Sequence, residues 1–253
     1  MIKLIKAVIW DLYGTLFFSK KNKRAIDPAS YDNLKRGMEY LNDNYNLDIN
    51  PDNGIKYYRE IVEKLHNKRV KKQPGLQHPE LDIMKLWQIF FSDYLNKAIN
   101  EKKAREIALN FEKAVNPVYV PQKNINLLKY LLKKNIIQGV LSNCQFYSLK
   151  ILEEEIGELN RYFEDDLFVL SYKTKAAKPD KKIYEKLLEK IEKKNILPEE
   201  SIMIGNDLDN DIIPLKKREF NTIYVTDTND YSEYADYIVH EIRQMYEIFE
   251  NLI

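Results

Sequence analysis

The chain has 253 residues, with 40 Lys and Arg side chains against 39 Asp and Glu, so its formal net charge is +1. This balance excludes the strongly basic surfaces that attract nucleic acids or anionic membranes, and neither is an expected partner. A hydrophobic fraction of 44% is typical of a globular protein and excludes global disorder. The chain has no run of about 18 apolar residues, and its single cysteine, Cys144, excludes an internal disulfide. We therefore expect a soluble, cytoplasmic protein.

Two kinds of pattern divide the chain. Residues 7–10 are apolar and β-favouring and end at Asp11, which predicts a buried central strand. The next hundred residues carry helical apolar stripes without a clear strand between them, over residues 31–45, 55–65, 83–94 and 104–111. From Pro117 onward, predicted strands and helices alternate. The predicted strands cover residues 136–141, 167–170, 202–204 and 222–225 and a short stretch ending at 239. The predicted helices cover residues 125–132, 146–156, 183–191 and 242–252, with a further helix around residue 212.

This order of elements predicts an α/β fold, with a Rossmann-like parallel sheet core and an inserted α-helical cap domain. The core comprises residues 1–17 and 120–253, and the cap comprises residues 18–119. The first strand has to join the later ones, because an isolated strand is not stable.

Polar side chains follow four predicted strands. Asp11 follows the first, Ser142 and Asn143 the second and an acidic segment, 205–211, the strand at 202–204, while Lys178 comes just past the strand at 167–170. Ligands bind beyond the carboxyl ends of parallel strands, so these groups are expected to surround a small anion. Asp11 can act as a nucleophile whose charge Lys178 or a cation neutralises, and Ser142 and Asn143 can donate hydrogen bonds to the transferring group.

This ordered set of motifs resembles the haloacid dehalogenase superfamily of hydrolases. The resemblance covers the core, whereas the cap matches only in position and helical character. It implies that Asp11 is the nucleophile within Asp11-Leu12-Tyr13-Gly14-Thr15, that Ser142 and Lys178 belong to the second and third motifs, and that Gly205 through Asp211 form the fourth. In such an enzyme the aspartate forms an ester that water then hydrolyses. Thr15 can hydrogen-bond the nucleophile.

Two departures from the family pattern point to different reactions. The family's phosphatases usually carry a second aspartate two positions after the nucleophile as general acid and base. Tyr13 occupies that position, and a phenol with a pKa near ~10 is a poor base at neutral pH, so this motif resembles the metal-free L-2-haloacid dehalogenases. The acid-rich fourth motif instead suits Mg²⁺. The candidate metal ligands are Asp11, Tyr13, Asn206, Asp207 and Asp211.

The preferred interpretation is an Mg²⁺-dependent phosphatase acting on a small, anionic phosphorylated metabolite. One alternative is a metal-free 2-haloacid dehalogenase, and another is a non-catalytic relative that binds a ligand or a protein partner. Candidate substrate-binding residues in the cap are His78 and Glu80, in a polar segment between two helices, and Arg24. Arg24 and Arg36 are the early-cap arginines that could grip a substrate carboxylate in a dehalogenase.

Overall fold

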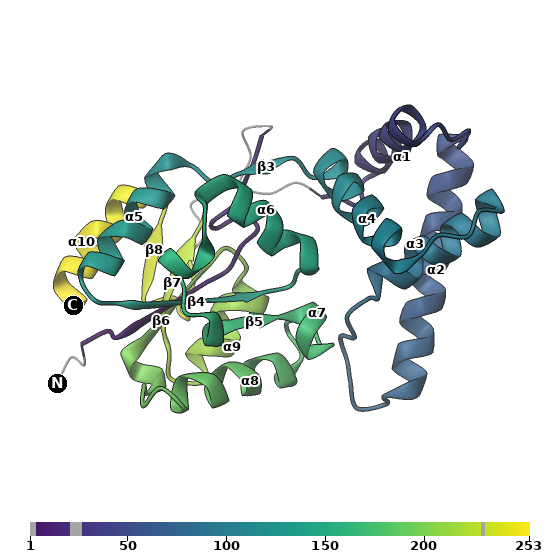
Figure 1. The fold of residues 1–253 in the computed structure, drawn as a ribbon. Helices are drawn as coiled ribbons and strands as arrows, with labels where there is room; N and C mark the ends of the chain where they lie inside the picture. The colour runs from purple at the N-terminus through teal and green to yellow at the C-terminus, as the bar shows by residue number, and fades with distance from the viewer. Residues whose placement is uncertain (1–3, 21–26, 229–230) are drawn as a thin grey trace.

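A computed structural model describes residues 4–20, 27–228 and 231–253 of the chain (Figure 1). Its main sheet has six strands in the order β5-β4-β1-β6-β7-β8, and every neighbouring pair is parallel. In chain order the strands of this sheet are β1 (Ala7–Trp10), β4 (Ile137–Ser142), β5 (Phe168–Leu170), β6 (Ser201–Gly205), β7 (Asn221–Val225) and β8 (Tyr237–Val239). The predicted parallel sheet is therefore confirmed.

Strand β1 lies at the centre of the sheet, as its unbroken apolar sequence predicts. All four of its residues are buried, and it pairs with β4 on one side and β6 on the other. Ala7 and Ile9 pack into one hydrophobic cluster and Val8 and Trp10 into another, because successive side chains of a strand point to opposite faces of the sheet. The sheet is thus covered on both faces.

Helices from the second half of the chain supply that cover. α8 packs its buried Ile183, Leu187 and Ile191 into the cluster that contains Ala7 and Ile9, whereas α5 and α10 contribute to the other cluster. The helices that accompany the sheet are α5 (Gln122–Lys133), α6 (Phe146–Ile156), α7 (Ser171–Thr174), α8 (Lys181–Glu192), α9 (Ile213–Lys216) and α10 (Ile242–Leu252). Shorter helical turns are η2 (Leu159–Arg161), η3 (Asp165–Leu167), η4 (Pro198–Glu200) and η5 (Leu208–Ile212).

The four predicted apolar stripes form a separate group of helices beside the sheet (Figure 1). These are α1 (Tyr31–Tyr45), α2 (Pro51–Lys72), α3 (Ile83–Ile89) with its π-helical extension η1 (Phe90–Tyr94), and α4 (Glu101–Val115). Aromatic rings pack at the centre of this group. The ring centroid of Phe111 lies 4.7 Å from that of Trp87 and 5.6 Å from that of Tyr58. This packing explains why apolar residues recur at helical spacing in these four segments.

A two-stranded antiparallel sheet, which the sequence analysis did not predict, stands where the chain enters and leaves these helices. Its strands are β2 (Phe18–Ser19) and β3 (Val118–Tyr119). Two-residue strands are too short for a period-two pattern to reveal them. They lie at the predicted boundaries of the cap. None of the helices in the described part of the chain is long and apolar enough to cross a membrane.

Candidate active site

Lys178, from the third predicted motif, contacts both the first and the fourth. Its Nζ lies 2.8 Å from Oδ1 of Asp11 and 2.5 Å from Oδ1 of Asp211, and it also donates to the carbonyl of Leu141 at 3.2 Å. All three N–H bonds of the ammonium are therefore used. Burial alone lowers the pKa of Lys178, but the carboxylates of Asp11 and Asp211 raise it above the usual range, so the side chain stays charged.

The side chain of Asn143 fixes the loop that carries this lysine. Its Nδ2 donates to the carbonyl of Lys178 at 3.0 Å, and its Oδ1 accepts from the backbone N–H of Lys178 at 2.6 Å. The amide therefore positions the Lys178 loop, and its second N–H, on an exposed residue that lines the cavity described below, is left for the predicted hydrogen bond to a transferring group.

Asp211 reaches Lys178 because Gly205 has no side chain. A Cβ at Gly205 would lie 2.4 Å from Cβ and Oδ2 of Asp211, which is closer than real contacts allow. Asp211 is 1% exposed, and burial raises its pKa to about 7 although the charge of Lys178 opposes the shift. Asp11 also raises it. Two buried carboxyl groups thus share one ammonium, and the raised pKa of Asp211 means that Lys178 alone does not keep both of them fully ionised at neutral pH.

The loop after β1 is tied to the fourth motif. Thr15 Oγ1 donates to Oδ1 of Asn206 at 3.2 Å, rather than making the predicted bond to Asp11. Gly14 has φ of +85°, and a Cβ there would meet Nδ2 of Asn206 at 2.5 Å, so this turn requires glycine. Asn124 on α5 donates to the carbonyls of Thr15 and Leu16 and fixes the loop from behind.

Ser142 lies at the end of β4, next to this cluster, and is 1% exposed. Its Oγ has no hydrogen-bond partner among the described residues. A buried hydroxyl without a partner costs free energy unless another group satisfies it. The hydroxyl therefore keeps its hydrogen-bonding capacity for a ligand.

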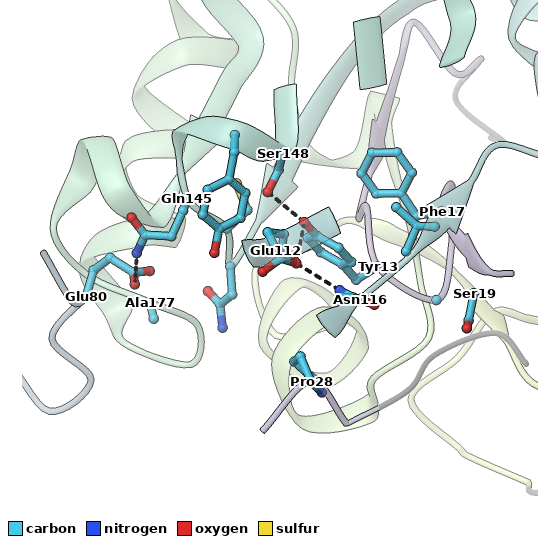
Figure 2. A pocket seen from close by; sticks show the side chains of 15 residues that line it. Tyr13, Phe17, Ser19, Pro28, Glu80, Glu112, Asn116, Gln145, Ser148 and Ala177 are labelled. Carbon is cyan, nitrogen blue, oxygen red and sulfur yellow. Dashed lines mark hydrogen bonds between the residues drawn. The ribbon is translucent and has the colours of Figure 1, made fainter. Parts of the chain in front are cut away.

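Tyr13 does not join the carboxylates through its side chain, in contrast to its predicted place among the metal ligands. Its hydroxyl lies 2.8 Å from Oγ of Ser148 on α6 and donates to Oε1 of Glu112 on α4 at 3.5 Å (Figure 2). Burial raises the pKa of Tyr13 well above its usual value, with the charge of Glu112 as the next cause. The phenol therefore remains protonated at neutral pH.

Asp207, another predicted metal ligand, serves as a helix cap. Its Oδ1 accepts from the backbone N–H groups of Asp209 and Asn210 at 3.0 Å, and its Oδ2 accepts from Nδ2 of Asn210 at 2.7 Å. The residue is exposed and begins η5. Of the fourth motif, Asp211 and Asn206 are the residues that face the first motif.

A cavity of about 430 Å³ opens between the cap helices and this edge of the sheet (Figure 2). Glu80 lines it, as predicted for a substrate-binding residue, and accepts a hydrogen bond from Gln145 at 2.6 Å. The side chain of His78 is exposed and does not line the cavity, although its carbonyl accepts from Ala177 at 2.8 Å. Arg24 lies outside the described residues. Arg36 bonds within the cap, to Asn33 and to the carbonyl of Val115.

Comparison with known proteins defines the family. The model of the haloacid dehalogenase-like hydrolases matches residues 5–218. The chain belongs to this family of hydrolases. A glyceraldehyde 3-phosphate phosphatase of Pyrococcus furiosus is 34% identical over 98% of this chain and 95% of its own length.

Solved structures of family members share this fold at lower sequence identity. A phosphatase of the family from Thermococcus onnurineus superimposes with a TM-score of 0.58 and 19% identity, covering 96% of this chain and 97% of its own. A 2-haloacid dehalogenase from Pseudomonas syringae superimposes with a TM-score of 0.63 and 17% identity, covering 99% of this chain and 100% of its own. Both activities thus occur on this fold, so the fold alone does not choose between them.

The donor set of this hydrolase fits Mg²⁺. Within the described ranges, no three His, Cys, Asp or Glu side chains form a ready-made cluster. Mg²⁺ needs no such cluster, because it keeps several waters and binds through one or two carboxylates. The carboxyl groups of Asp11 and Asp211 offer oxygen donors, and Asn206 is joined to the first motif through Thr15. A small hard cation would favour ionisation of both carboxyl groups.

Glu112 is a charged cavity residue that the sequence motifs did not single out. It is half-buried, lies on α4 four residues after the buried Ala108, and faces the pocket that Tyr13 also lines. The signal was present in the sequence, since an acid four residues after a stripe position falls on the buried face of the helix.

Proposed function

We propose that this hydrolase is an Mg²⁺-dependent phosphatase of small phosphorylated metabolites, with Asp11 as its nucleophile. The observation that carries the proposal is the arrangement of Asp11, Asp211 and Lys178 at the carboxyl edge of the sheet. Two buried carboxylates face one ammonium there, at 2.8 and 2.5 Å from its Nζ. A bound cation would let both carboxyl groups ionise together, which supports a metal-dependent phosphatase over a metal-free dehalogenase.

The similarity to a relative with a matching activity supports the same reading. That relative, 34% identical over nearly the whole chain, is a glyceraldehyde 3-phosphate phosphatase. Such a substrate is a small phosphomonoester, in the class we propose here.

The proposed reaction has two steps. A carboxylate oxygen of Asp11 bonds to phosphorus while the bond from phosphorus to the leaving-group oxygen breaks, and that oxygen takes a proton from water. A second water then adds to phosphorus, which releases inorganic phosphate and restores the carboxylate. Lys178 reduces the repulsion between Asp11 and the anionic substrate, and Ser142 donates the hydrogen bond for which it has no protein partner.

Asp11, Asp211 and Asn206 are the residues that would hold Mg²⁺. When bound, the ion neutralises charge on the phosphoryl oxygens. Tyr13 supplies a hydrogen-bond donor at position 13 rather than a base, since its raised pKa keeps it protonated. Asn143 positions Lys178 through the backbone.

The test measures hydrolysis of p-nitrophenyl phosphate and of 2-chloropropionate, each with Mg²⁺ and with EDTA. We expect Mg²⁺-dependent release of p-nitrophenol and no chloride release. Asp11→Asn should lower kcat by at least about 10⁴-fold, as removal of a nucleophile does. Asp209→Asn, an exposed residue of the fourth motif, is the matched control and should retain activity.

Chloride release that persists in EDTA would instead establish a dehalogenase. Turnover of neither compound, with Asp11→Asn unchanged from the parent protein in ligand binding, would establish a non-catalytic relative.

A further inference from the structure

The cavity beside the candidate active site has two ends of different character. Gly14, Asn143 and Ala177 line part of the cavity, and each belongs to a catalytic motif or is adjacent in sequence to a motif residue. The other end is lined by polar groups of the cap helix α4 and the core helix α6, among them Glu112 and Ser148. A molecule with its phosphoryl group at the first end would extend its remaining atoms toward the second.

Glu112 is the main charged group at that second end. Its Oε1 accepts from Nδ2 of Asn116 at 3.0 Å and from the hydroxyl of Tyr13 at 3.5 Å (Figure 2). A third hydrogen bond comes from Tyr147. Burial raises the pKa of Glu112 while these three hydrogen bonds lower it. The carboxyl is thus held in place by donors from both the cap and the core.

The contacts of Glu112 leave room for one more donor. A carboxylate offers about four acceptor positions on its two oxygens. Asn116, Tyr13 and Tyr147 account for three of them. The remaining surface of the half-buried side chain faces the cavity. A ligand hydroxyl could occupy the fourth position without displacing a protein contact.

We propose that Glu112 determines substrate specificity by accepting a hydrogen bond from a hydroxyl on the leaving group of the phosphomonoester. This inference rests on the proposed phosphatase function. The substrate class is a short phosphate ester whose leaving group is uncharged and bears a hydroxyl, such as a polyol phosphate. Tyr13, in the place of the usual aspartate, is then a positioning residue that links the nucleophile loop to Glu112.

The carboxyl group of Glu112 should also affect which charge a leaving group can carry. Glu112 is an acidic residue of the cavity lining, so its carboxyl group faces a bound leaving group. A leaving group that carries its own carboxylate would meet like charges in a partly buried space, where repulsion is stronger than in water. The site therefore selects for an uncharged leaving group as well as for a hydroxyl.

Three substrates with the same three-carbon chain test the proposal. Propyl phosphate has no hydroxyl, glycerol 3-phosphate has two, and 3-phosphoglycerate replaces one of them with a carboxylate. We expect kcat/KM of the parent protein to be highest for glycerol 3-phosphate and lowest for 3-phosphoglycerate. Glu112→Ala should lower kcat/KM for glycerol 3-phosphate by about 10- to 100-fold, the range for loss of a hydrogen bond to a charged group, and leave propyl phosphate nearly unchanged.

Glu112→Gln keeps the size of the side chain and removes its charge. It should raise kcat/KM for 3-phosphoglycerate relative to propyl phosphate. Glu106→Gln and Glu106→Ala, on the exposed part of the same helix, are the matched controls and should leave all ratios unchanged. Ratios between substrates do not depend on the fraction of folded enzyme, and Glu112→Gln decides the matter if Glu112→Ala does not fold.

Equal changes for all three substrates in the Glu112 variants would overturn the specificity role and leave the phosphatase function intact. No turnover of any phosphate ester by the parent protein would overturn the proposed function itself.

Discussion

The two ends of the cavity are built in different ways. At the sheet edge, Asp11 and Ser142 stand at the ends of paired strands, and their neighbours in the sheet fix their backbone. At the cap end, Glu112 and Ser148 stand on helices that meet through side chains. The groups proposed for chemistry thus rest on a hydrogen-bonded ladder, whereas the groups proposed for specificity rest on helix packing. Substitutions should therefore affect the two ends unequally.

The largest effect is expected at the centre of the sheet edge. Lys178→Met leaves the buried carboxylates of Asp11 and Asp211 without their counter-ion, which should destabilise the protein by about 3–5 kcal/mol. Urea unfolding would measure the loss. Adding Asp211→Asn to this variant should restore part of the stability, and Lys181→Met, an exposed lysine that begins α8, should have little effect. A stable Lys178→Met variant would contradict the electrostatic account of this edge.

A smaller effect is expected where the two acidic motifs pack. Gly205→Ala forces a methyl group onto Asp211, and such overpacking should cost about 1–3 kcal/mol of unfolding free energy. It should also weaken Mg²⁺ binding, which isothermal titration calorimetry can measure. Gly75→Ala is the control, because no atom lies within 4 Å of a Cβ at that position. Equal unfolding free energies and equal Mg²⁺ affinities of the two variants would mean that Asp211 can move away from the added methyl group without cost.

Replacement of Ser142 is expected to raise the stability of the protein and to lower its activity. Ser142→Ala removes a buried hydroxyl that has no partner in the described structure, so unfolding free energy should rise by about 1 kcal/mol. Its kcat should fall by about 10²-fold, as for loss of one donor to a developing charge. Ser201→Ala should instead lower stability, since that buried hydroxyl donates to the carbonyl of Leu197. Loss of stability in Ser142→Ala would show that the hydroxyl is satisfied.

The smallest effect concerns the pH dependence of stability at the cap end. Burial raises the pKa of Glu80, so the folded protein holds that proton more tightly than the unfolded chain does. The stabilisation from this proton is fully present below the pKa of Glu80 in the unfolded chain. It is lost as pH rises through the pKa of Glu80 in the folded protein. Because glutamine does not titrate, Glu80→Gln should gain stability relative to the parent protein as pH rises.

Glu106 provides the opposite case. A hydrogen bond from Lys103 lowers its pKa, so its contribution is present above the unfolded pKa and is lost as pH falls through the folded pKa. Glu106→Gln should therefore lose stability relative to the parent protein as pH rises. Thermal unfolding from about pH 3 to about pH 8, a range that starts below the usual pKa values of carboxyl groups, measures both slopes. Slopes of the same sign would contradict the burial of Glu80.

Much of the fold could be predicted because its elements carry strong local patterns. The strand Ala7–Trp10 and the helix Phe146–Ile156 agree with the structure at both ends, since their apolar residues stop at polar or turn-forming ones. The β2–β3 pair could not be predicted, because two residues carry no periodicity. The partners of Tyr13 were equally hidden, since they lie 99 and 135 residues away.

The sequence by itself determined the order of the motifs and their attachment to strand ends. In a parallel sheet those ends share one edge, so the meeting of Asp11 with Lys178 followed from topology. Only the tertiary structure decided which polar groups are free to act. Asn143 binds the backbone of Lys178 and Asp207 caps η5, whereas the hydroxyl of Ser142 has no partner among the described residues. Hydrogen-bonding capacity is a property of the packed neighbourhood, and a linear pattern does not record it.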